Sequence, residues 1–189
     1  AYDAHLGVLK DHGISIMTRD DNSAIDLFEN SISDSVVLCR ILCSYEMRWA
    51  LRNYKDTGLL SDELGLWLAM AEDITLDDYR QALHQRDGIR DAFRKLAPLA
   101  DAIITLPSPG PAPAVDFLAD AGEETYAFKT GSPSFNAATS LLGAPSITVP
   151  HMAVDGMPLD VQLIAQLNQD WPLVGHARWL MQNLERQRT

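Results

Sequence analysis

The 189-residue sequence predicts an α/β fold, and three features lead to this prediction. Apolar residues recur at helical spacing through most of residues 1–100, as in amphipathic helices. A helix that ends at Gly13 is followed by the β-prone segment 14–18, and this helix–glycine–strand joint is common in α/β proteins. Short apolar segments separated by turn residues follow in residues 101–189, as expected of strands.

The first 100 residues are predicted to be a helical scaffold. Residues 34–53 carry apolar side chains three and four positions apart, which predicts one buried stripe on a helix. The stripe consists of Val37, Leu38, Ile41, Leu42, Tyr45 and Trp49. A shorter helix is predicted at residues 61–71. The next helix begins at Thr75, where the sequence Thr-Leu-Asp-Asp resembles a capping box, and it ends before Pro98.

Residues 102–106 predict a short buried strand, followed by a proline-rich loop at residues 107–113. Four prolines in these seven residues fix the backbone angle φ and exclude both a helix and a central strand. Two interpretations of the loop remain open. It is either a surface linker or a defined loop at the carboxyl end of the strand, where open α/β sheets tend to bind their ligands.

Two further strands, at residues 146–149 and 159–164, are predicted to pair with each other. Pro150 follows the first strand, and Asp155 with Gly156 forms a strong turn signal between the two. A final helix is predicted from Asp170, with this aspartate as its N-cap, to about residue 187.

The charge of the chain argues against two classes of partner. Its 15 basic and 26 acidic side chains give a net charge of −11. A nucleic-acid-binding surface and a surface that docks on an anionic membrane both need clustered Lys and Arg, so neither partner is expected. The longest apolar runs, such as residues 64–71, are far shorter than the roughly 20 residues needed to cross a bilayer.

We expect a reduced, cytoplasmic protein without a metal or a cofactor. Cys39 and Cys43 lie four positions apart and would share one helix face as small buried side chains. They do not suggest a zinc site, because no His or Cys cluster completes the four ligands. The sequence begins with Ala1 rather than Met and shows no export signal, so we expect a processed chain or a piece of a longer one.

The usual catalytic and nucleotide-binding motifs are absent from the sequence. It has no phosphate-binding loop, no G-x-G-x-x-G, no H-E-x-x-H and no G-x-S-x-G. For a serine–histidine–aspartate triad, His151 is the best-placed general base, because it directly follows Pro150 at the end of a strand. The alternative is a turn histidine in contact with solvent. The residues alone therefore predict an α/β domain without a complete active site.

Three blocks in the last 90 residues resemble the amidase signature family. Residues 101–113 are similar to D-V-L-L-T-P-T-x-P-G-P-A-P, and residues 135–150 are similar to F-x-x-P-x-(T/N)-L-x-G-x-P-x-x-x-x-P. Residues 155–164 are similar to D-G-L-P-x-G-V-Q-L-(V/I). The order and spacing of the three blocks make the resemblance far more specific than any one of them. The departures from the family pattern are Leu106, Pro107, Ala138, Ser140 and Asp160.

The resemblance implies a partial amidase signature fold, in which helices flank a mixed β-sheet. Residues 1–189 would form a single domain equivalent to the C-terminal part of an amidase, with residues 1–100 helical and the strand, loop, hairpin and final helix in 101–189. Catalysis in the family relies on two serines, a lysine and a glycine-rich loop, all in the N-terminal half. Here none of the 11 glycines is adjacent to another, so no catalytic residue can be carried over.

The resemblance also implies a function and a set of pocket residues. By position, the residues expected to line the acyl pocket are Ser108, Phe135, Asn136, Thr139 and Ser140. The alternative for each is loop packing without substrate contact. The expected activity is hydrolysis of a small-molecule carboxylic amide, or of a related C–N bond, by the full-length enzyme, with this chain inactive alone. The competing hypothesis is a binding module that pairs with itself or with a chain carrying the missing half, because a half-sheet exposes an apolar face and an unpaired edge.

Overall fold

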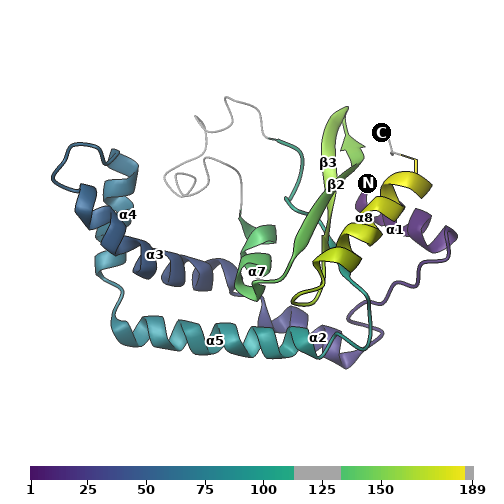
Figure 1. Ribbon diagram of the computed structural model, residues 1–189, viewed down its shortest axis with the longest axis horizontal. Coiled ribbons are helices and arrows are strands. Elements are labelled where there is room, and N and C mark those ends of the chain that lie inside the picture. Colours follow the sequence, from purple (N-terminus) through teal and green to yellow (C-terminus); the bar gives the residue numbers. More distant parts are fainter. Residues whose placement is uncertain (113–132, 186–189) are drawn as a thin grey trace.

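The computed structural model describes residues 1–112 and 133–185, and it confirms the α/β class (Figure 1). Five helices lie within the first 100 residues: α1 (Tyr2–Asp11), α2 (Ser23–Ser31), α3 (Ser35–Tyr54), α4 (Asp62–Glu72) and α5 (Leu76–Arg94). The remaining described elements are β1 (Ile103–Thr105), α7 (Ser134–Leu142), β2 (Ser146–Val154), β3 (Met157–Ile164) and α8 (Asp170–Asn183).

The described strands form one sheet in the order β1-β3-β2, and both pairings are antiparallel. The predicted hairpin is confirmed, with Asp155 and Gly156 in its turn at φ angles of 51° and 76°. The first hairpin strand does not end at Pro150 as predicted, because β2 continues to Val154. A bulge between Val149 and Met152 accommodates the proline, which has no N–H to donate to a ladder.

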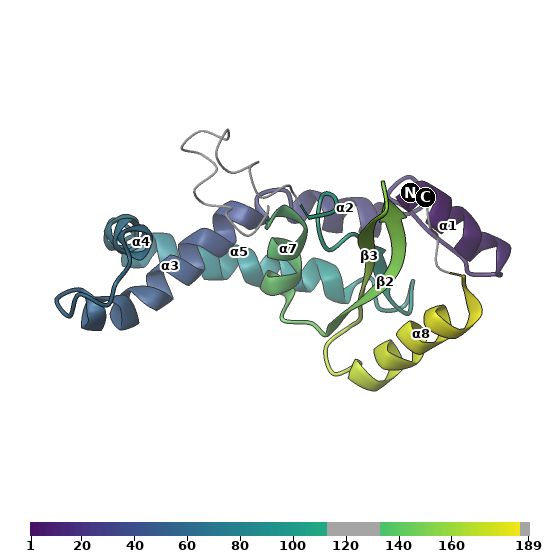
Figure 2. The same ribbon diagram turned by 90° about the horizontal axis from the view of Figure 1, so that it is seen from above.

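Side-chain alternation on the sheet separates the two larger of its apolar cores. Ile103 pairs with Ile164, and both contact the core formed with α2, α3, α5 and α7. The next pair, Ile104 with Leu163, contacts the core formed with α1 and α8. Successive strand residues point to opposite faces, so this register fixes which helices cover which face. Figure 2 shows the hairpin between α7 on one side and α8 on the other.

The segment 14–18 is not a strand, contrary to the prediction. It keeps the alternating burial of a strand, because Ile14 and Ile16 pack on the α1–α8 core while Ser15 and Met17 are exposed. Within the described residues no strand pairs with it, and an extended segment counts as a strand only when a ladder partner is present.

The stripe on α3 is buried in part only. Leu38 and Leu42 are buried as predicted, whereas Val37 and Trp49 are exposed. The second half of α3 extends with α4 away from the sheet, and there α3 packs on α4 rather than on the sheet (Figures 1 and 2). Arg48 and Arg52 instead lie over the Trp49 ring.

The two cysteines of α3 also differ from the prediction. Cys39 is half-buried, and its thiol donates to the Ala137 carbonyl at 3.2 Å. Cys43 is exposed, because positions four apart on a helix are offset in angle and α7 covers only the first of them. Burial raises the pKa of the Cys39 thiol to about 11, which disfavours its reactive thiolate form.

The helix starts follow the predictions at α5 but not at α8. The Thr75 hydroxyl accepts from the Asp78 amide, and the Asp78 carboxylate accepts from the Thr75 amide, which confirms the capping box. At α8 the N-cap is Gln169, without a side-chain cap, and Asp170 is the first helical residue. Its carboxylate therefore lies in the first turn, where it favours the helix dipole.

Replacing Gly143 by alanine is expected to destabilise the protein by about 1 kcal/mol or more. Gly143 ends α7 at a φ of 62°, and an added Cβ would lie 3.0 Å from the Arg90 side chain. The matched control is Gly88→Ala within α5, where a Cβ meets nothing within 4 Å. This control should stabilise by up to about 1 kcal/mol, because alanine is the better helix former. Urea unfolding of both variants checks the opposite signs, and equal effects would contradict the prediction.

Candidate functional site

A chain of side-chain hydrogen bonds joins β1, α7 and β3 at the carboxyl end of β1. The Asn136 amide donates to the Pro107 carbonyl at 2.8 Å, just beyond β1. The Gln162 amide on β3 donates to the Asn136 Oδ1 at 3.1 Å. The Thr139 hydroxyl donates to the Gln162 Oε1 at 3.1 Å. We call this set the amide relay. It holds the start of the proline-rich loop against α7 and the sheet.

Local structure explains why these side chains meet. Asn136 and Thr139 are three positions apart on α7, so they lie on one helix face. Gln162 pairs with Thr105 and Thr148 in the middle of the sheet. Thr139 is 9% exposed and Gln162 4%. Polar groups buried this deeply need partners, and the relay supplies them.

The five predicted pocket residues take different positions. Asn136 and Thr139 come together in the relay. Phe135 and Thr139 line a large groove. The Ser108 hydroxyl is turned into its own loop, where it donates to the Gly110 carbonyl at 2.6 Å. Ser140 is exposed, and neither serine belongs to the groove wall that the described residues form.

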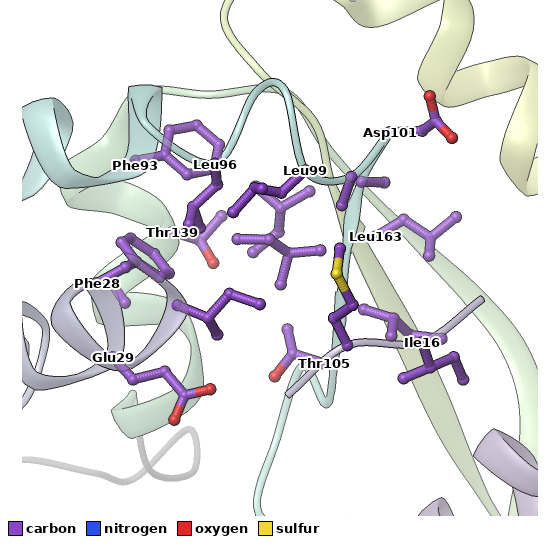
Figure 3. Close-up of a pocket in the computed structure, with 18 of the residues that line it drawn as sticks. Ile16, Phe28, Glu29, Phe93, Leu96, Leu99, Asp101, Thr105, Thr139 and Leu163 are labelled. Atoms are coloured by element: carbon purple, nitrogen blue, oxygen red, sulfur yellow. The ribbon is translucent and has the colours of Figure 1, made fainter. Parts of the chain in front are cut away.

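The groove has a volume of about 1150 Å³ and a mostly apolar wall (Figure 3). Phe28, Phe93 and Leu96 line one side of it, and Ile16 and Leu163 line the other. Polar side chains form the smaller part of the wall, and they include the labelled residues Glu29, Asp101, Thr105 and Thr139. The groove therefore suits an apolar occupant with a few polar contacts.

His151 is not placed to act as a general base. It lies within β2, 1% exposed, and not in a solvent-exposed turn. Its Nε2 is 3.2 Å from the Leu180 carbonyl, and its ring lies against His5. Both interpretations of this residue from the sequence were wrong, because the strand continues past Pro150 and carries the ring into the core.

Residues 1–112 and 133–185 offer neither a metal site nor a membrane span. No three His, Cys, Asp or Glu side chains in these ranges group as metal ligands would. Of the described helices, none combines the length and apolarity that a membrane crossing requires.

Gln162 is the relay member that the sequence analysis did not select. It belongs to the third block that resembles the amidase signature family, residues 155–164, but it is not among the residues expected to line the pocket. A signal was available, because Gln162 is a polar residue within the apolar strand segment Val-Gln-Leu-Ile. A long polar side chain at such a position needs a buried partner.

Comparisons with known proteins identify solved structures that share this architecture. No protein-family model and no curated protein matches the sequence. Among solved structures, an amidase matches 81% of this chain and 36% of its own, with a TM-score of 0.70 and 22% identity. The second match is a chain from a vestigial protein complex that is said to reveal the evolutionary origins of an s-triazine catabolic enzyme. It covers 88% of this chain and 40% of its own, with a TM-score of 0.64 and 18% identity. A bacterial aryl acylamidase of the amidase signature family matches 81% of this chain and 34% of its own, with a TM-score of 0.52 and 18% identity.

The chain has a partial amidase signature fold. It spans about a third of the length of the solved structures it matches, and the identities establish the fold alone. Within this fold, the amide relay lies at the carboxyl end of β1, and Thr139 belongs both to the relay and to the groove wall.

Substituting Gln162 by leucine is expected to destabilise the protein by about 1–3 kcal/mol, because it leaves the buried Thr139 hydroxyl without an acceptor and the Asn136 carbonyl oxygen without a donor. The control is Ser140→Ala on the same helix, which removes an exposed hydroxyl and should change stability by less than about 0.5 kcal/mol. Urea unfolding measures both. A Gln162→Leu variant as stable as the control would show that the relay contributes nothing.

Proposed function

We propose that this chain supplies the framework and part of the acyl-pocket wall of an amidase. The residues that break the bond belong to polypeptide outside these 189 residues. One observation carries the proposal: a partial amidase signature fold is combined with a sequence in which none of the 11 glycines is adjacent to another, so it has no Gly-Gly-Ser stretch. The substrate of the whole enzyme is a small-molecule carboxylic amide or a related compound with a C–N bond.

The chemistry of acyl transfer explains why this chain is inactive alone. Hydrolysis of an amide needs an activated nucleophile and donors aimed at the oxyanion. In the described residues, the Ser108 hydroxyl is engaged with the Gly110 carbonyl rather than with a base. A site without nucleophile and oxyanion donors keeps only weak binding effects.

The same site gives the chain a role in substrate binding. Phe135 and Thr139 line the groove, and Asn136 fixes the start of the proline-rich loop. We assign these three residues, with Ser108 and Ser140, to the wall of the acyl pocket. In this assignment Ser140, which is exposed here, faces the part of the enzyme that this chain lacks.

The sheet supports association with a missing half. Strand β1 ends the described sheet, with β3 on one side and the Tyr2 hydroxyl bonded to the Ile104 carbonyl at 2.9 Å. The extended segment 14–18 and β1 both line the apolar groove. Unpaired strand edges beside apolar surface favour the addition of further strands. The partner is a polypeptide with the remaining strands or, as the second candidate, another copy of this chain. We assign the protein, as a single domain, to the cytoplasm, where its two free cysteines stay reduced.

The purified 189-residue chain should hydrolyse no amide faster than buffer does. The reason is that the nucleophile and the oxyanion donors are missing from it. The measurement is ammonia or amine release from a panel of aliphatic and aromatic amides. Hydrolysis by the pure chain that is abolished by a serine-directed inhibitor would overturn the proposal. An in-frame upstream coding sequence with a lysine and a Gly-Gly-Ser stretch would support it.

The isolated chain should self-associate or bind a dye that reports apolar surface. The exposed groove and strand edge are the cause. Size-exclusion chromatography with light scattering gives the mass, and dye fluorescence gives the exposed apolar surface. A monomer that binds no dye would contradict the association role. It would not bear on the amidase assignment, which the activity assay tests separately.

A further inference from the structure

Two fully buried histidines lie side by side between α1, β2 and α8. His5 on α1 is 0% exposed, and His151 on β2 is 1% exposed. Their ring centroids are 5.4 Å apart, and the ring planes are tilted by 46°. Neither histidine belongs to the groove or to the amide relay.

The hydrogen bonds of this pair are incomplete. The Nε2 of His151 lies 3.2 Å from the Leu180 carbonyl of α8. The other three ring nitrogens, both of His5 and the Nδ1 of His151, have no partner in the described structure. A neutral imidazole tolerates such a site better than a charged one, because burial penalises charge far more than an unmet hydrogen bond.

Among the described residues, no carboxylate acts on His5. From β2 the titratable group that acts on it is His151, which lowers its pKa further. From α1 itself, the Asp3 charge acts on the Tyr2 hydroxyl, and from α8 the Leu180 carbonyl contacts His151. Burial first, and the charge of His151 second, lower the pKa of His5 to about 4.

Helix α1 depends on His5 for its attachment. Its buried side chains are His5 and Leu9, and the Tyr2 hydroxyl adds one hydrogen bond to β1. The helix is followed by Gly13, at a φ of 81°, and by the unpaired segment 14–18. Tyr2, Leu6 and Val8 are partly buried against the same cores. A change at His5 therefore acts on one of the two fully buried side chains of the helix.

We propose that the two histidines form a pH-sensitive latch: α1 stays docked on β2 and α8 while His5 is neutral, and acid releases α1 and uncovers the α1–α8 core. This inference does not depend on the proposed amidase role. It assigns a regulatory function to a pair of residues that the catalytic framework does not use.

The direction of the effect follows from proton linkage. A released α1 exposes His5, whose pKa returns to 6.5, whereas the docked value is about 4. The released form therefore binds the proton more tightly, and docking weakens as the pH falls below 6.5. Between pH 7 and pH 5.5 the ratio of released to docked helix should rise about eightfold.

Hydrogen exchange of the intact chain at pH 7 and pH 5.5 tests the latch. This range lies above the isoelectric point of about 4.7, so the protein keeps its negative charge. Amides of α5 serve as the internal reference for the intrinsic effect of pH on exchange. Relative to α5, protection of α1 should fall about eightfold. Unchanged relative protection of α1 would overturn the proposal.

Three variants separate the buried pair from other histidines. His5→Leu and His151→Leu each remove one member, and the first should abolish the fall in α1 protection. His12→Gln is the matched control, because His12 caps the same helix but is exposed, so it should keep the fall. A fall that persists in His5→Leu overturns the latch. If a leucine variant does not fold, histidine-selective NMR titration of the unmodified chain decides: a His5 pKa near 4 supports the latch, and one near the ordinary 6.5 overturns it.

Discussion

The register between β1 and β3 is the constraint on which the rest of the molecule depends. It sends Ile103 and Ile164 to one face and Ile104 and Leu163 to the other. A slip of one residue would exchange the two sets and leave each helix layer against the wrong side chains. The same register places Gln162 opposite Thr105, at the point where the relay reaches α7. Core packing and site geometry are therefore fixed by one short ladder.

Much of this fold could be predicted from local sequence. The capping box at Thr75, the turn at Asp155 and Gly156, and the strand after residue 101 rest on backbone chemistry within a few residues. The segment 14–18 could not be predicted correctly in the same way. Its β propensity is local, but a strand is a property of two segments, and the described chain supplies no second one. The burial of Trp49 was predicted wrongly for a related reason, because a side chain on a helix is buried only where another element packs over it.

The candidate site was harder to predict than the fold. Asn136 and Thr139 could be selected by their place in a motif, but their joint role appears only when Gln162 approaches from β3. That approach spans 26 positions of sequence between Asn136 and Gln162, and no periodicity encodes it. The buried pair of His5 and His151 is a stronger case, because 146 positions of sequence separate the two rings. Tertiary partners decide what both sets of polar side chains do.

Because of the bulge at Pro150, the two edges of the described sheet differ in how readily they could pair with a further strand. β2 is an outer strand, and its proline removes a donor there while the bulge interrupts the ladder. Helix α8 packs along the same strand. Growth by strand addition is thus hindered at β2. At β1 the Tyr2 hydroxyl occupies the Ile104 carbonyl, and no further strand of the described residues pairs with this edge. When one edge of a sheet can pair, two molecules can associate edge to edge and no third can add to them. A fibre that grows without limit needs two such edges.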